Sequence, residues 1–423
     1  MDASRDQLRV GFISQWFPPE PVVVPASIFD ALASEFDTVA ITGQPNYPEG
    51  ALHDGFRAYG NSYALEGGRK VRRTPVYPDH SSSVIGRILN YCSWAASATL
   101  FARREVSQTD VNFVYASPIM AALPAMAAKV THGIPFVLNI QDLWPDSVFA
   151  TGFITDGPLR KVAEWSVGSF ADLAYRMASA VITISPGMGG VLEERGVDPS
   201  KIHLVYNWAD ESILEKNADA LDDSRDTVRS ELGLSPLSRV LAYAGNVGPA
   251  QGLHHVVEAL SLLTEEKDDC HLVIIGDGVE LPRVKLLVEA LSLEKRVTFV
   301  GRVPSTQVPR FLRAADASLV SLGDSELFRH TMPSKVQAIL ASGSPIFVVG
   351  QGDVAQVATR SGAGWATTSE PESLVNALRA FAADDEGPAR GEAAAAFYFS
   401  EMSRSIGTQR LASVLREATG HAI

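Results

Sequence analysis

The sequence predicts an α/β protein with two doubly wound domains, and three observations lead to that prediction. Short runs rich in β-branched residues alternate with stretches of helical periodicity along the 423 residues. These runs are almost entirely apolar, which is typical of parallel strands covered by helices on both faces. They fall into two series, which the acidic and weakly patterned residues 209–226 separate. Strands that alternate with helices in two series favour two parallel sheets.

The two series of strands set the expected domain boundary. In the first series we expect strands at 8–14, 38–42, 112–116, 135–140, 180–185 and 202–206. In the second series we expect strands at 240–245, 271–276, 297–301, 317–322 and 345–349. We therefore predict an N-terminal domain at 1–207, a C-terminal domain at 208–399, and a terminal helix at 400–423 that can pack back on the first domain. Ligands of such sheets bind beyond the carboxyl ends of the strands.

The composition of the chain narrows the class of protein. A content of 46% hydrophobic and 20% charged residues is typical of a folded protein, and the length suits two domains. The net charge of -13 argues against general nucleic-acid binding. Cys92 and Cys270 lie in apolar surroundings, which indicates a reducing compartment rather than a disulfide scaffold. The N-terminal residues lack a signal-peptide pattern, and no apolar run is long enough to predict a spanning helix.

Residues 57–104 form a basic block with eight Arg and Lys residues against two acidic ones. Within it, residues 88–102 are apolar and have arginines on both sides. A helix of this kind, at 85–104, suits the surface of an anionic membrane. The same pattern is typical of a core helix whose flanking arginines are solvated. The sequence leaves both interpretations open.

A glycine-rich segment at 243–253 follows the first strand of the second series. The predicted strand ends at Gly245, glycines recur at 248 and 252, and a helix follows. Glycines let backbone amides approach a phosphate, and a helix N-terminus adds partial positive charge. A plain strand–turn–helix connection is the alternative interpretation. The G-x-G-x-x-G fingerprint does not follow the first strand of the chain, which argues against a dehydrogenase.

A second candidate phosphate site lies at 330–347, where a predicted helix begins near Pro333 and ends at Gly343. Thr331 or Ser334 can cap this helix, and Lys335 adds a mobile positive charge to its first turn. Together with the glycine-rich segment it would form a cradle for a diphosphate; a capped structural helix is the alternative. We expect no metal and no cofactor, because the sequence has no Cys/His cluster at ligand spacing and no Asp-x-Asp.

The chain resembles the bacterial retaining glycosyltransferases of family 4. The most specific motifs of the resemblance are QPNYPEG at 44–50 and DLWPD at 142–146, supported by ISQWFPPE at 13–20, YAGNVGPAQGL at 243–253 and MPSKVQAILASGSPI at 332–346. The resemblance covers nearly the whole chain. It implies the GT-B fold, in which two Rossmann-like domains face a central cleft. More narrowly, the chain is similar to the branch that builds surface polysaccharides, including N-acetyl-L-fucosamine transferases.

The resemblance implies a donor site in the C-terminal domain and an acceptor site in the N-terminal domain. The implied donor is a nucleotide-sugar, in the first place a UDP-sugar, with its diphosphate at the two candidate phosphate sites and its ribose near Gln337. The implied donor-site residues are Gly245, Asn246, Gln251, Gly276, Asp277, Arg302, Val303, Arg329, Ser334, Lys335 and Gln337. The implied acceptor-side residues are Phe17, Glu20, Asn46, Tyr47 and Trp144. Asp142 and Lys335 are the implied catalytic residues, Asp142 in an orienting role.

The implied acceptor is a polyprenyl-linked sugar or an oligosaccharide used in capsule, O-antigen or exopolysaccharide assembly. This implies a cytoplasmic protein, peripheral at the inner face of the membrane, with an anionic membrane surface as a candidate partner of 85–104. The sequence does not identify the sugar, the linkage, the acceptor or the oligomeric state.

The sequence departs from the family at four donor-site positions. The family commonly has an Arg and a Lys in the loop where this chain has Asn246 and Gln251, and two glutamates where it has Arg329 and Gln337. Lys335, Arg329 or Arg302 could replace the missing charge. Because of these departures two alternatives stay open: a non-catalytic partner protein with this fold, and a sugar-nucleotide epimerase.

Overall fold

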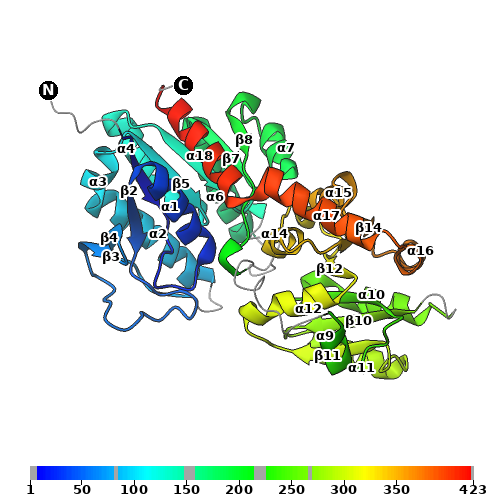
Figure 1. Cartoon of the computed structure of the whole chain (residues 1–423). Helices are drawn as coiled ribbons and strands as arrows, with labels where there is room; N and C mark the ends of the chain where they lie inside the picture. Colours follow the sequence, from blue (N-terminus) through cyan, green and yellow to red (C-terminus); the bar gives the residue numbers. More distant parts are fainter. Residues whose placement is uncertain (1–6, 81–83, 147–157, 214–224, 265–268, 421–423) are drawn as a thin grey trace. The chain divides into compact units, whose positions relative to one another are not determined.

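The computed structural model describes residues 7–80, 84–146, 158–213, 225–264 and 269–420. It divides the chain into two compact units (Figure 1). The N-terminal unit comprises Met1–Tyr206 and Gly407–Ile423, and the C-terminal unit comprises Asn207–Ile406. Each unit is built around one largely parallel sheet with helices packed on it, which confirms the predicted α/β class.

The sheet of the N-terminal unit has the strand order β3-β4-β2-β1-β5-β6-β7-β8, in which only β3 and β4 pair antiparallel. Its strands are β1 (Arg9–Ile13), β2 (Asp37–Gly43), β3 (Ser62–Glu66), β4 (Arg69–Thr74), β5 (Val111–Ala116), β6 (Phe136–Ile140), β7 (Ala180–Thr183) and β8 (Ile202–Leu204). The six expected strands are all present. The edge pair β3 and β4 was not expected, because its residues are largely polar.

Helices bury both faces of this sheet. One face packs against α2 (Val84–Phe101), α3 (Arg103–Ser107), α4 (Leu123–His132), α6 (Pro158–Met177) and α7 (Pro186–Glu194). On the other face, Phe12 stacks on Phe113 with ring centroids 5.6 Å apart and meets Phe29 of α1 (Val23–Glu35) edge-on. Most of α18 (Arg404–Ala418) also belongs to this unit, and its Arg416 forms an ion pair of 3.3 Å with Glu35 of α1.

Helix α2 lies within the basic block, and the structure shows which of its faces is buried. Trp94 and Ala98 are fully buried in the core of the N-terminal unit. Leu89 and Leu100 are 49% and 72% exposed. The core interpretation is therefore correct for one face, and the other face leaves apolar side chains in solvent. In the part of the chain that the structure describes, no helix is both long and apolar enough to cross a membrane.

The sheet of the C-terminal unit has the order β11-β10-β9-β12-β13-β14, and all neighbouring strands are parallel. Its strands are β9 (Arg239–Ala244), β10 (Cys270–Ile275), β11 (Val297–Gly301), β12 (Ala317–Ser321), β13 (Ile346–Val349) and β14 (Gly364–Thr367). Only β14 was not expected. Because β9 lies between β10 and β12, the chain reverses its direction of winding there, so loops diverge at the carboxyl ends of β9 and β12.

Helices of the C-terminal unit lie before, between and after these strands in the sequence. They are α9 (Arg225–Glu231), α10 (Leu253–Ser261), α11 (Leu281–Ala290), α12 (Val308–Ala314), α13 (Glu326–Arg329), α14 (Ser334–Ala341), α15 (Asp353–Arg360), α16 (Pro371–Ala382) and α17 (Gly387–Phe397). The core on one face of the sheet is formed by α10, α11 and α16. On the other face, α12 packs against β9 and α9, and α14 packs against β12.

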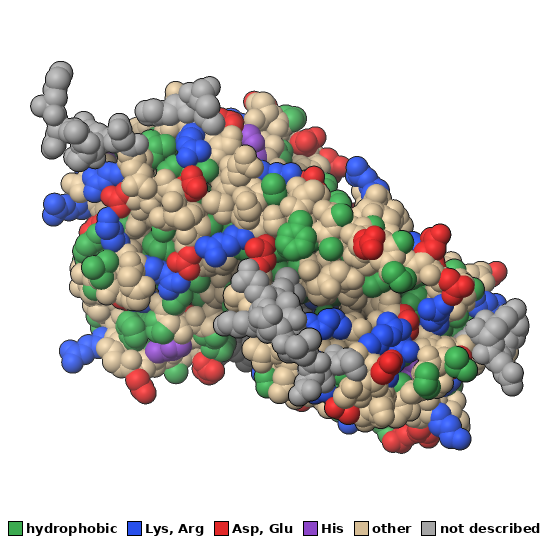
Figure 2. All heavy atoms as spheres, in the orientation of Figure 1, with side chains coloured by type: hydrophobic (Ala, Val, Ile, Leu, Met, Phe, Trp, Pro, Cys, Tyr) green, Lys and Arg blue, Asp and Glu red, His purple; other side chains and the backbone are tan. Residues whose placement is uncertain are grey.

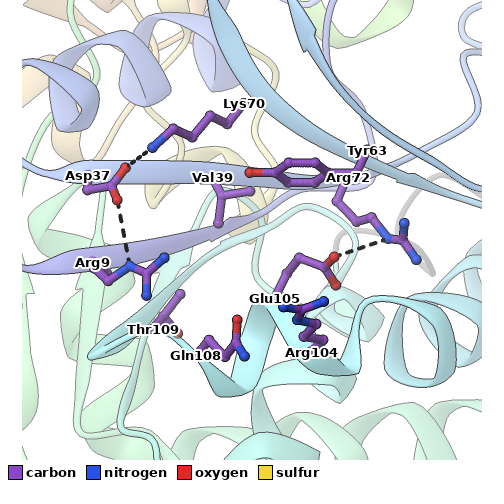
Figure 3. A pocket seen from close by; sticks show the side chains of 10 residues that line it. All are labelled: Arg9, Asp37, Val39, Tyr63, Lys70, Arg72, Arg104, Glu105, Gln108 and Thr109. Carbon is purple, nitrogen blue, oxygen red and sulfur yellow. Dashed lines mark hydrogen bonds and ion pairs between the residues drawn. The ribbon is translucent and has the colours of Figure 1, made fainter.

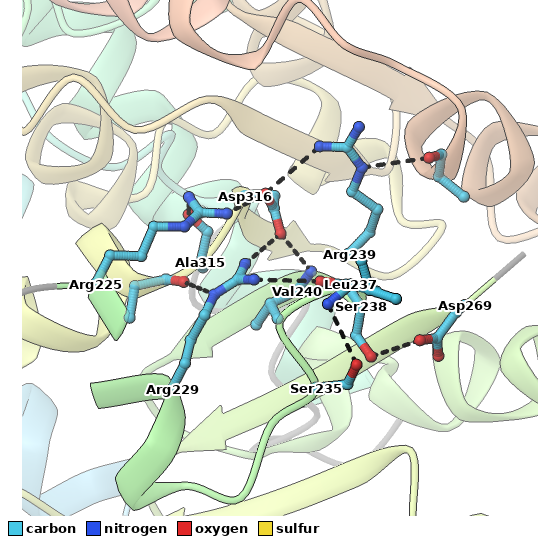
Figure 4. Close-up of polar contacts among 12 residues, drawn as sticks. Arg225, Arg229, Ser235, Leu237, Ser238, Arg239, Val240, Asp269, Ala315 and Asp316 are labelled. Atoms are coloured by element: carbon cyan, nitrogen blue, oxygen red, sulfur yellow. Dashed lines mark hydrogen bonds and ion pairs between the residues drawn. The ribbon is translucent and has the colours of Figure 1, made fainter. Parts of the chain in front are cut away.

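A largely buried aspartate, Asp316, lies at the amino edge of this sheet and connects α9, β9 and β12 (Figure 4). The Asp316 carboxylate accepts hydrogen bonds from Arg225 (2.5 Å), Arg229 (2.6 Å) and the amide of Val240 (2.7 Å). It also lies 3.7 Å from the guanidinium of Arg239. Burial alone would raise the pKa of Asp316, but the Val240 amide and the arginines outweigh it and lower the pKa. The carboxylate therefore stays ionised in the fold.

We expect Asp316→Asn to lower the free energy of unfolding by about 3 kcal/mol at neutral pH, because it leaves the buried Arg229 without its charge partner. The pKa of Asp316 is lower in the folded protein than in the unfolded chain, where it lies near 3.8, so the ionised carboxylate stabilises the fold above that pH. This stabilisation is lost as the pH falls through the pKa of the folded protein. The difference between variant and wild type should therefore shrink below about pH 4. Urea unfolding over this pH range measures it.

Asp385→Asn is the matched control, since Asp385 pairs with Arg239 at 2.7 Å but is 93% exposed. An exposed pair contributes at most about 1 kcal/mol. Equal urea midpoints for the two variants at neutral pH would contradict the role given to Asp316.

Candidate functional site

The carboxyl edge of the C-terminal sheet contains a pocket of about 810 Å³. Its walls come from the loops that follow β9, β10 and β11. The lining residues are Gly245, Asn246, Ile275, Gly276, Asp277, Arg302, Val303, Pro304, Ser305 and Val308. Six residues of the expected donor site, at positions 245, 246, 276, 277, 302 and 303, thus lie around one cavity.

Two glycine-containing loops pack backbone against backbone beside this pocket. The amide of Val247 donates to the carbonyl of Asp277 at 2.9 Å, and the amide of Gly245 donates to the carbonyl of Ile275 at 2.9 Å. A Cβ atom at Gly276 would lie 1.9 Å from the carbonyl oxygen of Gly245. The close approach of the two loops therefore requires glycine here, whether or not a phosphate binds.

The loop after β9 is also fixed to the end of β12. The amide of Gly323 donates to the carbonyl of Ala250 at 2.8 Å. Within the loop, the Gln251 side-chain oxygen accepts a hydrogen bond from the amide of Gly248 at 3.0 Å. Gln251 is not among the described residues that line the pocket, and its side chain instead closes the 3₁₀ turn Pro249–Gln251. The loop is therefore held in shape by its own contacts.

Lys335, in the first turn of α14, stands beside the end of β9. Its Nζ donates to the hydroxyl of Tyr243 at 3.1 Å and lies 4.2 Å from the centre of the Tyr243 ring. A Cβ atom at Gly245 would lie 3.1 Å from this Nζ. Burial lowers the pKa of Lys335 to about 8. The expectation of a mobile charge is therefore wrong, because a ring and a hydroxyl hold this ammonium at the rim of the pocket.

Sequence reasoning missed Tyr243, which is fully buried in β9. Its hydroxyl accepts from Lys335 and donates to the carbonyl of Asn246 at 2.6 Å. Tyr243 thus connects the first turn of α14 to the glycine-containing loop. The sequence did contain a signal, a tyrosine in an otherwise aliphatic predicted strand directly before the glycines. A buried Tyr hydroxyl requires a hydrogen-bond partner, so this residue could have been expected to bond to a neighbouring segment.

The start of α14 differs from the expected capped helix. Pro333 is the N-cap residue, and no side chain caps the helix, so neither Thr331 nor Ser334 acts as expected. Gln337 is 1% exposed, and its amide nitrogen, in the orientation that satisfies its surroundings, donates to the carbonyls of Pro333 and Ser334 at 3.0 Å each. The helix ends at Gly343 as predicted, with a φ of 68°.

The buried Gln337 amide explains the choice of residue at this position. An amide can donate to two carbonyl oxygens, whereas an ionised carboxylate can only accept. The side chain is thus occupied within its own helix. A contact between Gln337 and a ribose stays a prediction.

The remaining donor-site candidates lie outside the described pocket lining. Ser334 is exposed in the first turn of α14. Arg329 is on the short helix α13, where it is 47% exposed and pairs with Glu326 at 3.2 Å. The expected set therefore divides into six lining residues, Lys335 at the rim, and four residues, Gln251, Arg329, Ser334 and Gln337, that are placed elsewhere.

Four of the five expected acceptor-side residues are buried in the N-terminal unit: Phe17, Glu20, Asn46 and Trp144. The Glu20 carboxylate accepts hydrogen bonds of 2.9 Å from the amides of Phe17, Asn46 and Tyr47. Burial raises the pKa of Glu20 more than these amides lower it. The Phe17 ring packs against Phe29 at 5.1 Å and is 1% exposed. Glu20 and Phe17 therefore shape the loops after β1 and β2 rather than offer side chains to solvent.

A cluster of aromatic rings lies at the carboxyl edge of the N-terminal sheet. Trp16 is 5.4 Å from Tyr47 and 6.2 Å from Tyr91, Tyr47 is 5.0 Å from His80, and Tyr91 is 6.1 Å from Trp144. Among the described residues, Trp16 Nε1, His80 Nε2 and Trp144 Nε1 are buried atoms without a hydrogen-bond partner. The cluster thus combines apolar ring faces with unused polar atoms. We refer to these five residues as the aromatic cluster.

Asp142 lies next to the aromatic cluster, in the loop after β6. Its carboxylate accepts a hydrogen bond of 2.8 Å from the hydroxyl of Ser117, which follows β5. The side chain reaches solvent, but the bulky groups around it desolvate the carboxylate and raise its pKa, and the Ser117 hydroxyl offsets this in part. Asn46 is buried nearby and accepts from the Asn90 amide at 3.0 Å. No group of three metal-binding side chains occurs in the part of the chain that is described.

Both halves of the chain match known families. Residues 21–208 match the glycosyl transferase 4-like domain, and residues 224–396 match the glycosyl transferases group 1. The chain is 27% identical over 340 residues to WcaI of Escherichia coli (strain K12), a glycosyl transferase provisionally named for colanic acid biosynthesis. The match covers 79% of this chain and 80% of WcaI.

Two further similarities are more distant. The chain is 25% identical to WbjE of Pseudomonas aeruginosa, provisionally named a glycosyltransferase, over 60% of this chain and 62% of WbjE. The crystal structure of Anabaena HepE in complex with UDP and glucose superposes with a TM-score of 0.63 at 18% identity, covering 96% of this chain and 99% of HepE. The fold is GT-B, with two parallel-sheet α/β units.

We expect Gln337→Glu to lower the free energy of unfolding by about 2 kcal/mol at neutral pH, because a buried carboxylate would face two carbonyl oxygens. A protonated Glu can donate again, so the loss should diminish as pH falls toward 4. Thermal unfolding from pH 7 to pH 4 measures this. Gln356→Glu on the exposed side of α15 is the matched control. Equal stability of the two variants at pH 7 would contradict the hydrogen bonds assigned to Gln337.

Proposed function

We propose that this chain, a glycosyltransferase by its two matched domains, transfers a sugar from a UDP-linked donor to a lipid-linked or oligosaccharide acceptor of surface-polysaccharide assembly. The observation that carries the proposal is the pocket at the carboxyl edge of the C-terminal sheet, with Lys335 held at its rim. The relation to WcaI supports the pathway, and the fold shared with UDP-bound HepE supports the donor class.

The donor diphosphate would lie between the glycine-containing loop after β9 and the first turn of α14. The Lys335 ammonium lies beside Gly245, and the amino end of α14 adds partial positive charge. Charge grows on the diphosphate as the glycosidic bond breaks, so a fixed ammonium stabilises the transition state more than the ground state. Because Tyr243 holds Lys335 before the donor arrives, little reorganisation is needed during the reaction.

The nucleoside would occupy the part of the pocket lined by Asp277, Arg302 and Val303. Asp277 already accepts a hydrogen bond from the amide of Gly278 at 2.7 Å, and its other oxygen can accept from a ribose hydroxyl. Arg302 supplies a second cation to the pocket, which suits a donor with two phosphates. Gln337 would stabilise the start of α14 through its hydrogen bonds to the carbonyls of Pro333 and Ser334, and the predicted contact with the ribose would come in addition.

The acceptor would bind at the aromatic cluster in the N-terminal unit. Sugar rings present C–H faces that pack on aromatic rings such as those of Trp16 and Tyr47. Asp142 would orient the attacking hydroxyl. In a retaining reaction of this kind, the acceptor hydroxyl would attack the anomeric carbon from the same face that the diphosphate leaves. The departing phosphate would then take the proton of the hydroxyl, so no further base is required. The exposed apolar face of α2 would contact the membrane that carries a lipid-linked acceptor.

A transfer assay tests this function directly. The protein is incubated with a panel of UDP- and GDP-sugars, including UDP-N-acetyl-L-fucosamine, and with a short polyprenyl-diphosphate-linked sugar, and products are identified by mass. We expect a product from a UDP-sugar that retains the configuration of the donor. Conversion of a UDP-sugar without acceptor would identify an epimerase, transfer from a GDP-sugar alone would refute the donor assignment, and no turnover with any donor would favour a non-catalytic partner.

The binding of UDP should depend on pH through Lys335. With a pKa of about 8, the ammonium is charged at pH 7 and largely neutral at pH 9. We expect calorimetry to show about tenfold weaker UDP binding at pH 9 than at pH 7, since one charged contact is lost. Lys335→Ala should bind UDP weakly at both pH values, whereas Lys295→Ala, which changes an exposed lysine of the same unit, should behave as wild type.

Unfolding does not account for such a loss. A lysine whose folded pKa lies below 10.5 destabilises the fold while it is charged, and this cost disappears as pH rises from 8 toward 10.5. Equal UDP affinity at pH 7 and pH 9 in the wild type would remove Lys335 from the proposed diphosphate site.

A further inference from the structure

Three buried amide side chains connect the segments that carry the aromatic cluster. Charged side chains of the N-terminal unit are spread over its surface (Figure 2), whereas Gln15, Asn46 and Asn90 are at most 2% exposed. Gln15 follows β1, Asn46 follows β2, and Asn90 lies in α2. We refer to these three residues as the amide triad. Three separate segments of the unit are thus joined by polar groups that solvent does not reach.

Asn90 is the centre of the amide triad. Its side-chain oxygen accepts a hydrogen bond from the side-chain nitrogen of Gln15 at 2.5 Å. Its side-chain nitrogen donates to the side-chain oxygen of Asn46 at 3.0 Å and to the carbonyl of Tyr77, which follows β4, at 2.7 Å. Neither an ionised aspartate nor a leucine of similar size can supply one acceptor and two donors. A buried polar network of this kind favours a single arrangement of the segments that it joins.

Each residue of the amide triad is followed directly by a ring of the aromatic cluster. The three pairs are Gln15–Trp16, Asn46–Tyr47 and Asn90–Tyr91. In each pair the amide residue is buried and the ring residue is only partly buried. The ring of Trp16 lies 5.4 Å from that of Tyr47 and 6.2 Å from that of Tyr91. The three rings that meet in the cluster are therefore carried by the same main-chain segments whose amides meet in the triad.

The stability of the fold does not by itself explain the amide at Gln15. Among the described residues, its side-chain oxygen is a buried atom without a hydrogen-bond partner. Such an atom costs free energy, because it has left water without gaining a new partner. A methionine of similar length would fill the same space without this cost. The amide of Gln15 is therefore explained by the bond that it donates to Asn90.

We propose that the amide triad positions the aromatic cluster for the acceptor sugar, with Asn90 as the positioning residue on which the arrangement depends. Asn90 acts through the rings and does not touch the acceptor. A sugar that packs on several rings at once requires each ring face at a set place and angle, so the shift of one loop weakens its binding. The inference rests on the proposed function, since it takes the aromatic cluster as the acceptor site.

Two variants of the full chain test the position of the rings. Asn90→Ala removes the three bonds at the centre of the triad, and Gln15→Met removes one bond while it keeps the volume of the side chain. In protein labelled with fluorotryptophan, we expect the fluorine signal of Trp16, assigned with Trp16→Phe, to shift in both variants. The signal of Trp365, which lies beside Phe347 in the C-terminal unit, should stay in place.

Steady-state transfer measures the consequence for the acceptor. We expect Asn90→Ala to raise the KM for the acceptor about tenfold and to lower kcat by less than about twofold, because ground state and transition state lose the same contact. Gln15→Met should raise this KM by about threefold, since one bond of three is lost. The affinity for UDP, measured by calorimetry, should equal that of the wild type, because the donor pocket lies in the other unit.

Asn112→Ala is the matched control. Asn112 is a fully buried asparagine at the amino end of β5, where it donates to the carbonyl of Val106 at 3.0 Å and accepts from the Thr109 hydroxyl at 3.3 Å. Figure 3 shows this opposite edge of the sheet, where Thr109 and Arg9 line a pocket. We expect Asn112→Ala to lose stability in urea unfolding as Asn90→Ala does, but to leave the Trp16 signal and the acceptor KM unchanged.

The outcomes separate positioning from stability. An unchanged Trp16 signal in both triad variants would overturn the proposal, and so would a shifted signal with an unchanged acceptor KM. Equal increases of KM in Asn90→Ala and Asn112→Ala would show that KM follows stability alone, which would overturn it as well. If Asn90→Ala does not fold, Gln15→Met decides by the same criteria. A wild type without transfer would contradict the proposed function, and the Trp16 signal would still decide whether the triad positions the cluster.

Discussion

The parallel pairing of strands is the constraint on which the rest of the molecule depends. Parallel strands require a crossover after each strand, and all of their carboxyl ends meet at one edge of the sheet. In the C-terminal unit this brings the loops after β9, β10 and β11 around one pocket. In the N-terminal unit it brings the loops after β1, β2 and β6 to the aromatic cluster and Asp142. The amino ends of the strands lie at the opposite edge of each sheet. In the C-terminal unit this edge contains Asp316 and the arginines that contact it.

Desolvation is the physical effect that links the fold to the proposed chemistry. Lys335 lies against the ring of Tyr243 at the rim of the pocket, and burial lowers the pKa of Lys335. The same low-polarity surroundings strengthen its attraction to a diphosphate, because water screens the charges less. In the proposed donor site, Lys335 would supply positive charge to the diphosphate although the loop after β9, at 245–252, contains no Arg or Lys. Tyr243 makes this possible by holding the ammonium in place.

The fold could be predicted from the sequence where strands are apolar throughout. The same criterion failed for β4, because Arg69, Lys70, Arg72 and Arg73 give an edge strand the composition of a loop. Resemblance placed six residues around one pocket, since motif order in a parallel sheet fixes which loops share an edge. The resemblance could not show that the Gln337 side chain bonds to carbonyls of its own helix. A glutamine can form hydrogen bonds either with nearby carbonyls or with a ligand, so the residue type does not distinguish the two. Tyr243 was missed because only its three-dimensional neighbours give it a role.

The return of α18 to the N-terminal unit has a consequence for biosynthesis. The chain leaves this unit at Tyr206 and re-enters it at Gly407, and the C-terminal unit is encoded between the two. The apolar residues of α18, such as Leu411 and Leu415, are buried in the finished protein. During translation, part of the surface of the first-made unit therefore stays uncovered until α18 has left the ribosome. The C-terminal unit, whose residues are contiguous, can be complete before the unit that precedes it.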